Sequence, residues 1–176
     1  MAYGNLNEQE SMYQSVEAAL SHAYRLSCMR IEPLNNTAQI CHWMESKGAG
    51  LGGYRGMTQH DWHANSAMIR ARVERLLNHL EVCAVEAQYG GNLSRIVDLS
   101  SHILNQQQGI PLLVCDALLS HIFSGSPKQT EIQDRFDLSK GKLYRQLKRV
   151  NQVVNALLNS AICKLEPDFK QAGIVK

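Results

Sequence analysis

Six long polar side chains, five of them cationic, are crowded into ten positions near the C-terminal end of the sequence. They are Lys140, Lys142, Tyr144, Arg145, Lys148 and Arg149. Cationic side chains of this length bind phosphate oxygens, and arginine also forms paired hydrogen bonds with a guanine edge. This pattern therefore predicts contact with a polyanion, and duplex DNA fits it best.

The distribution of charge supports the same interpretation. The 176 residues carry a formal net charge of only +2. Yet Ser126 to Lys164 contains eight basic and three acidic residues, so the remainder of the chain is slightly acidic. A basic segment on an acidic body is typical of a protein in which one part binds a polyanion and another binds protein.

The segment that begins at Thr130 predicts a short helix followed by a tight turn. Thr130 is expected to cap this helix, whose inward residues Ile132 and Phe136 lie four positions apart on one face. Asp137 can adopt the left-handed conformation at modest cost, and Leu138 can fill the turn from inside.

A second, longer helix is expected to begin after Ser139, which can cap it. Its apolar residues recur on one side at Leu143, Leu147 and Val150, which places the cations and Gln152 on the opposite side. One face would then pack on a scaffold while the other enters a DNA groove. The alternative is an ordinary helical hairpin with a solvated basic face.

Apolar residues continue at helical spacing to Leu165, so the second helix is predicted to trail to that point before a tail at 167–176. Such a wide apolar face must pack on the body or form a dimer seam, and packing within the chain is favoured. Residues 1–125 are predicted to form a multi-helix body, which the break at Ser124 to Pro127 separates from a helix-turn-helix region at 126–166. The expected body helices are 8–29, Thr37–Ser46, Thr58–Tyr89, Leu93–Gln107 and Pro111–Phe123. The fold class predicted for the chain is therefore all-α.

The helix-turn-helix segment resembles the one in sigma-factor region four and its relatives. The shared framework is Ile132, Phe136, Leu138, Ser139, Leu143 and Leu147. Two positions depart from that pattern. Gln133 stands where a small residue is usual between the two helices, and Asp137 replaces the usual turn glycine.

Upstream, a short helix with Trp43, a glycine-rich loop with Tyr54 and a capped long helix precede this segment. Together with the helix-turn-helix, this order resembles phage late-gene antitermination proteins of the Q type, over about residues 37–164. The resemblance implies a protein that binds a DNA element near a late promoter and loads onto RNA polymerase to allow terminator readthrough. It names double-stranded DNA and RNA polymerase as partners and implies no cofactor.

Other motifs carry weaker signals. The loop Gly48 to Gly56 lacks the order of a phosphate-binding loop, so it is either a simple turn or a segment that contacts a partner. The candidate partner contacts in and beside it are Lys47, Tyr54 and Arg55. His60 and His63 lack a regular zinc spacing, so no metal site is predicted there. No catalytic constellation stands out, and we expect no enzyme activity.

The five cysteines are widely spaced with no CxxC pair, which predicts reduced thiols buried in a cytoplasmic protein. We find no signal-peptide pattern and no membrane-length apolar run in the sequence. Arg70, Arg72 and Arg75 share a polar stripe with Glu74, Glu81 and Glu86, either as a solvated face or as a second contact surface. Within the DNA-binding class, a monomer or dimer fits a regulator or a simple promoter repressor. A stable ring would instead favour a packaging protein of the terminase small-subunit kind.

Overall fold

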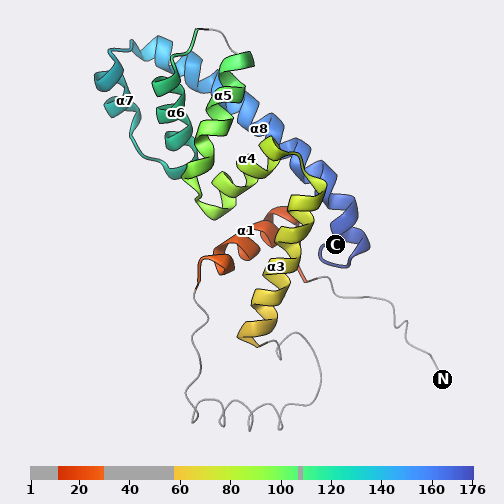
Figure 1. The fold of residues 1–176 in the computed structure, drawn as a ribbon. Helices are drawn as coiled ribbons and strands as arrows, with labels where there is room; N and C mark the ends of the chain where they lie inside the picture. Colours follow the sequence, from red (N-terminus) through yellow and green to blue (C-terminus); the bar gives the residue numbers. More distant parts are fainter. Residues whose placement is uncertain (1–11, 30–57, 107–108) are drawn as a thin grey trace, which may run out of the picture.

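The computed structural model describes residues 12–29, 58–106 and 109–176, and its regular elements there are all helices (Figure 1). In chain order they are α1 (Val16–Ser27), α3 (Gln59–Leu76), α4 (His79–Gly90), the 3-10 turn η2 (Leu93–Arg95), α5 (Ile96–Gln106), α6 (Leu112–Ser124), α7 (Gln129–Phe136) and α8 (Lys140–Gln171). The predicted all-α class is confirmed. Within these ranges, no helix combines the length and apolarity needed to span a bilayer.

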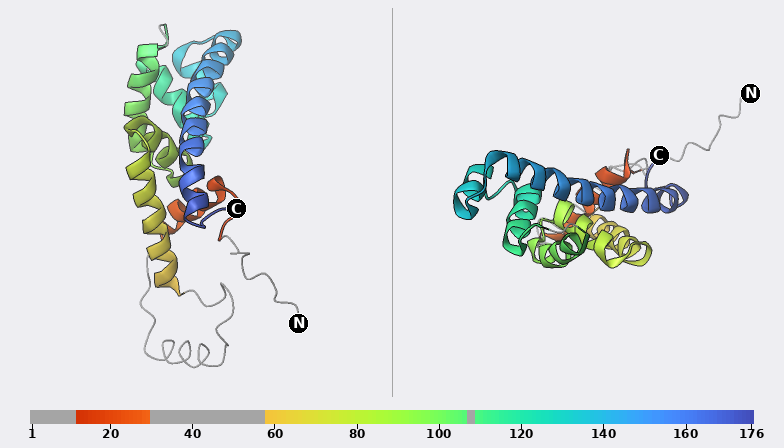
Figure 2. Two further views of the ribbon diagram at one scale, coloured as in Figure 1. Left: turned by 90° about the vertical axis from the view of Figure 1, so that its right-hand side faces the viewer. Right: turned by 90° about the horizontal axis from the view of Figure 1, so that it is seen from above.

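Helix α8 is the axis of the molecule. Its 32 residues correspond to about 48 Å at 1.5 Å per residue, and α3, α4 and α5 form a column along its length (Figure 2). Helices α6 and α7 lie beside the N-terminal end of α8, whereas α1 lies near its C-terminal end (Figure 1). One continuous helix thus connects the predicted helix-turn-helix with the opposite end of the protein.

Two hydrophobic clusters lie along α8. The cluster that we call the upper core consists of Cys83, Ala84, Ala87, Ile96, Leu99, Ile103, Ile110, Val114, Cys115, Ala117, Leu118, Leu119, Ile132, Leu143, Val150 and Val154. The lower core consists of Val16, Ala19, Leu20, Ala23, Tyr24, Ile69, Val73, Leu77, Val85, Ala161, Leu165, Phe169 and Val175. Because α4 and α8 contribute to both, these two helices join the halves of the molecule. The helices on either side of the predicted boundary after residue 125 both contribute to the upper core.

The apolar trailing part of α8 packs on the body, as predicted, but the helix does not end at Leu165. It continues through Pro167 to Gln171, where the sequence predicted a tail. Phe169 is fully buried in the lower core, and Arg72 donates to Asp168 at 2.6 Å. These contacts offset the lost backbone hydrogen bond and steric cost of an internal proline. Beyond the helix, Tyr13 donates its backbone N–H to Ile174 at 2.9 Å, which closes the chain end onto α1.

The predicted helix Thr58–Tyr89 is wrong in one respect, because the chain breaks between α3 and α4. Leu77 is extended, and Asn78 caps α4 in a capping box with Glu81. Because apolar residues keep their helical spacing across the break, periodicity alone does not reveal it. At the outer ends, Thr58 caps α3 in a capping box with Asp61, and Gly91, left-handed at φ 64°, ends α4.

Three further expectations differ from the structure or lie outside it. Helix α1 begins at Val16 with Ser15 as its cap, not near residue 8, because Tyr13 is held by the chain end. Met68 falls at helical spacing with the apolar residues of the expected helix Thr58–Tyr89, which predicts that it is buried, but it is 59% exposed. The expected helix at 37–46 and the glycine-rich loop lie outside the described residues.

Candidate nucleic-acid interface

Helices α6, α7 and α8 build the helix-turn-helix from one shared core. Ile132 of α7 and Leu143 of α8 are almost completely buried, and both belong to the upper core with the apolar face of α6. The two helices are thus held by a third helix, the arrangement that positions a recognition helix in this motif. The amphipathic spacing predicted the inward residues correctly.

The turn between α7 and α8 has the predicted geometry. Asp137 is left-handed, with φ 47° and ψ 50°. The backbone N–H of Leu138 donates to the Gln133 carbonyl at 3.1 Å, which satisfies one of the last carbonyls of α7. Leu138 is half-buried against the upper core. An aspartate therefore replaces the usual turn glycine here without opening the motif.

The caps of the two helices were predicted with mixed success. Ser139 does cap α8, since its side chain accepts from the Lys142 backbone N–H at 3.4 Å. Thr130 does not cap α7, which begins earlier, after Lys128. Glu131 secures that end by accepting from the Lys128 backbone N–H at 3.2 Å. A carboxylate in the first turn serves the free N–H groups as well as a capping hydroxyl would.

All six predicted contact residues are exposed on the first three turns of α8. Stepping about 100° per residue, Arg145, Lys148 and Arg149 lie opposite the buried row of Leu143, Val150 and Val154. Lys142 and Tyr144 lie at the two edges of this arc, and Lys140 lies beyond Tyr144, nearer to the buried side. Tyr144 adds an aromatic ring to this face and is 67% exposed. The structure therefore brings together the six residues Lys140, Lys142, Tyr144, Arg145, Lys148 and Arg149 on one surface, the cationic face of α8.

The charges on the cationic face are not neutralised within the protein. Across the ranges the structure describes, none of its five cations lies within 4.0 Å of a carboxylate oxygen. Arg145 donates its Nε to the Gly141 carbonyl at 3.2 Å and keeps its terminal guanidinium nitrogens for other partners. Cations left in this state are available to an external anion at little cost in broken contacts.

A hollow of about 550 Å³ separates α7 from the start of α8. Its lining residues are Gln129, Thr130, Gln133, Lys140, Gly141, Leu143 and Tyr144. Gln133 occupies the position where a small residue is usual, and the hollow beside it shows that the two helices do not close fully on each other. The opening carries amide and hydroxyl groups next to Lys140, which suit hydrogen bonding to phosphates or base edges.

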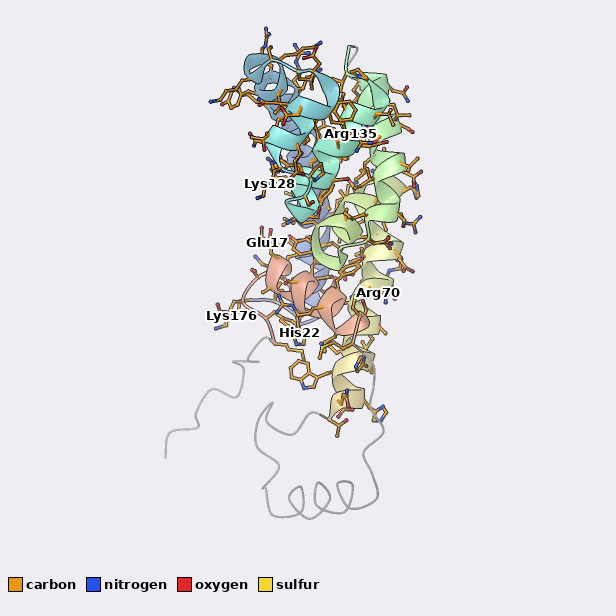
Figure 3. All side chains as sticks on the ribbon, turned by 90° about the vertical axis from the view of Figure 1, so that its left-hand side faces the viewer. Glu17, His22, Arg70, Lys128, Arg135 and Lys176 are labelled. Atoms are coloured by element: carbon orange, nitrogen blue, oxygen red, sulfur yellow. The ribbon has the colours of Figure 1, made fainter. Side chains whose placement is uncertain are left out.

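Two exposed cations of α7 were not among the predicted contacts. Lys128 precedes the helix and Arg135 lies in its last turn, where its guanidinium is 5.4 Å from the Phe136 ring centroid. Figure 3 shows both in the upper part of the molecule, on the α7 side. The signal that could have found them was the charge balance of 126–164, which includes them. The helical spacing of the α8 residues alone could not have indicated these two cations.

The arginine stripe of α3 is engaged inside the protein. Arg72 and Arg75 lie 2.6 and 3.4 Å from Asp168 at the end of α8, and the Arg70 guanidinium lies 5.7 Å from the Tyr24 ring centroid. These contacts favour a structural role over a second polyanion surface.

Glu81, which the sequence placed on this polar stripe, is instead 2% exposed. It accepts from Lys164 Nζ at 2.6 Å and from Ser160 at 2.7 Å. Burial alone would raise the pKa of this carboxyl, but the hydrogen bonds from Lys164, Ser160 and the Asn78 backbone outweigh burial and lower it. A buried carboxylate needs such partners, and α8 supplies two of them.

The remaining candidate residues for partner contact or metal binding lie in the N-terminal half of the chain. Lys47, Tyr54 and Arg55 lie outside the described residues, so their partner contacts stay a prediction. His60 is exposed and His63 half-buried, and within the described ranges they do not meet a third metal-ligand side chain.

Of the four cysteines in the described residues, two are buried, as expected, and two are exposed. Cys83 and Cys115 are in the upper core, and burial raises the pKa of Cys115 to about 11. Cys28 and Cys163 are exposed, which corrects the prediction that they are buried. Cys28 lies just past the end of α1, and Cys163 is on the outer side of α8, so neither reaches a core. Cys41 is outside the described residues.

Comparison of the chain with protein-family models and with curated proteins finds no match. The assignment of function accordingly rests on the geometry of α6 to α8 and on the resemblance of their sequence.

Proposed function

We propose that this chain is a sequence-specific DNA-binding transcription regulator without enzyme activity, which reads duplex DNA through the cationic face of α8. The observation that supports this most is that the five cations at 140–149 are exposed on a helix whose other side is a buried row, and that none of them pairs with a carboxylate among the described residues. An ordinary helical hairpin would have its surface charges interspersed with acids or paired across the helix.

The dimensions of the helix fit the proposed role. An α-helix is about 10–12 Å wide with its side chains, and the major groove of B-DNA is about 12 Å wide. The cationic face occupies only residues 140–149, the end of α8 that projects beside α7 (Figure 1). We assign base reading to Arg145 and phosphate binding to Lys142 and Lys148, which lie about 60° to either side of Arg145 around the helix.

The most concrete form of the proposal is antitermination. It follows from the resemblance to Q-type antitermination proteins, in which DNA binding near a late promoter leads to loading on RNA polymerase. On this proposal the helices that precede α7 contact the polymerase, while α7 and α8 contact DNA, and the protein acts in the bacterial cytoplasm at the nucleoid.

The DNA-binding step can be tested by selecting duplexes from a random library with the full chain and measuring affinity against salt. Arg145→Ala should weaken the selected site by about 1–3 kcal/mol and relax the preference at one base pair. Lys148→Ala should weaken all duplexes alike and make the salt slope shallower by about one unit.

Lys170→Ala is the matched control, because it removes one cation from the opposite end of the same helix. Lys170 lies 2.7 Å from Glu166 and about 33 Å along the axis from Lys148 at 1.5 Å per residue. Equal behaviour of the Lys148 and Lys170 variants would refute the assignment of the cationic face.

The polymerase step has its own test in a purified transcription system. Readthrough of a terminator that requires both the protein and its selected DNA site supports antitermination. Tight DNA binding without readthrough would leave a repressor or activator, and a closed ring of many copies in solution would favour a packaging protein.

A further inference from the structure

A histidine, a cysteine and an aspartate converge where α4 meets α5, away from the cationic face. His79 Nε2 lies 3.3 Å from Asp98 Oδ2. Cys83 Sγ lies 3.7 Å from the same histidine nitrogen and 3.8 Å from the same carboxylate oxygen. The three ligand-type atoms thus form a small, nearly regular triangle.

Local structure fixes each member of this triangle. His79 and Cys83 lie one turn apart on α4, which begins at His79 because Asn78 caps it. Asp98 lies in the first turn of α5, which packs directly on α4. Cys83 is fully buried in the upper core, while the side chains of His79 and Asp98 are 65% and 44% exposed. The triangle therefore has an anchored sulfur and an open side toward solvent.

The spacing matches a tetrahedral zinc site. With Zn–N and Zn–O bonds of about 2.0–2.1 Å and a Zn–S bond of about 2.3 Å, tetrahedral angles put nitrogen and oxygen about 3.3 Å apart and sulfur about 3.6 Å from either. The observed separations of 3.3, 3.7 and 3.8 Å lie within 0.2 Å of those edges. Hydrogen bonding among the three side chains also accounts for the contacts, but it does not require the sulfur to lie at nearly the same distance from both partners.

The charges around the triangle suit a divalent cation. A neutral imidazole, a thiolate and a carboxylate together carry two negative charges. Arg95, whose charge acts on Cys83 and Asp98, is itself paired with Glu86, with its Nε 3.0 Å from Oε2. On binding, the Cys83 S–H bond breaks, a Zn–S bond forms and one proton leaves to solvent.

We infer that His79, Cys83 and Asp98 bind one zinc ion, with a water molecule in the fourth position. The ion links the first turn of α4 to the first turn of α5 beside the upper core, on which α6, α7 and α8 pack. Its role is to stabilise that core, and the open coordination position leaves room for a ligand exchange that a closed four-ligand site would not allow.

The test uses the reduced full-length protein titrated with Co²⁺ alone, in the absence of oxygen. We expect one ion per chain, visible absorption of tetrahedral cobalt, and a near-ultraviolet thiolate-to-cobalt charge-transfer band that zinc removes. The melting temperature should rise with Zn²⁺, since the ion binds the folded state.

His79→Gln and Asp98→Asn test the site without risk to the core, because both side chains are exposed. Each should weaken binding by more than the about 10–100-fold that loss of an outer-shell partner causes. Cys83→Ser should abolish the charge-transfer band. His102→Gln, one turn beyond Asp98 on α5, and Cys163→Ser, an exposed thiol elsewhere, are matched controls that should bind as the wild type does.

Absence of stoichiometric cobalt uptake would overturn the inference. So would uptake without the charge-transfer band, or uptake that persists unchanged in the His79 and Asp98 variants. If the Cys83 variant fails to fold, the two exposed variants still decide the question.

Discussion

The two halves of α8 use charge in opposite ways. In the first half, the cations of residues 140–149 are exposed and have no carboxylate partner among the described residues. In the second half, Lys164 lies 2.6 Å from Glu81, Asp168 lies 2.6 Å from Arg72, and Lys170 lies 2.7 Å from Glu166. The same helix is thus open to an external anion at one end, whereas at the other end Asp168 ties it to α3, Lys164 ties it to α4, and Lys170 is paired within α8.

This contrast separates residues that stabilise the protein from residues that are available for binding. Removing one partner of a buried charge pair lowers stability, because the other charge is left desolvated and unpaired. An exposed, unpaired cation contributes little to stability, so it is available to bind an external anion such as DNA. Substitutions in the two halves should therefore change different measurements.

The largest expected effect on stability comes from the buried row of the first half. Leu143 is 2% exposed in the upper core, so Leu143→Ala should lower the free energy of unfolding by about 2–5 kcal/mol. Its neighbour Tyr144 is 67% exposed. Tyr144→Ala should leave the unfolding free energy within about 0.5 kcal/mol and lower DNA affinity instead. Chemical denaturation of both variants checks this, and equal losses would show that the orientation of α8 is wrong.

The next prediction compares the same lysine substitution in the two halves of α8. Lys164→Met removes the ammonium from the buried Glu81 carboxylate, while Ser160 and the Asn78 amide still donate to it. We expect a loss of about 1.5–3 kcal/mol, the range for hydrogen bonds to charged groups. Lys148→Met should leave the unfolding free energy unchanged and reduce DNA binding. If the two variants exchanged these phenotypes, the division of α8 would fail.

Local features of the sequence predicted the helix-turn-helix well. The inward residues Ile132 and Leu143, the left-handed Asp137 and the Ser139 cap all lie within about twenty positions, so spacing and turn chemistry determine them. The cationic face followed from the same spacing. Its use in DNA binding stays a proposal, because an exposed cation does not specify its partner.

The parts that were missed depend on contacts between distant segments. Glu81 and Lys164 are 83 residues apart, and only the packing of α4 on α8 reveals that a polar stripe residue is buried. For the zinc triangle, the spacing of His79 and Cys83 was readable, but Asp98 joins them through the angle between two helices. The break before α4 was readable from Asn78 and Glu81, yet continuous apolar spacing concealed it.

A smaller effect concerns a polar residue on the buried side of the first half. Gln146 is 5% exposed, and its side-chain carbonyl oxygen has no hydrogen-bond partner among the residues that the structure describes. Gln146→Leu removes this unsatisfied acceptor and should raise the unfolding free energy by about 1 kcal/mol. DNA affinity should not change, since residue 146 lies outside the cationic face. A loss of stability would indicate that a water molecule satisfies the carbonyl.

The smallest expected effect is a pH dependence that belongs to the second half alone. Hydrogen bonds hold the pKa of Glu81 below its ordinary value of 4.5 while burial opposes them, so the net shift is a difference of two larger contributions. A lowered folded-state pKa means that the stabilisation is complete above the unfolded pKa and is lost as pH falls through the folded one. Unfolding at a series of pH values from neutral to below 4.5 should show this loss in the wild type. Glu81→Gln, which carries no titrating carboxyl, should be less stable at neutral pH and flatter on the acid side. An unchanged acid slope in that variant would mean that other carboxyls govern acid unfolding and that the bonds to Lys164 and Ser160 do not favour the charged form.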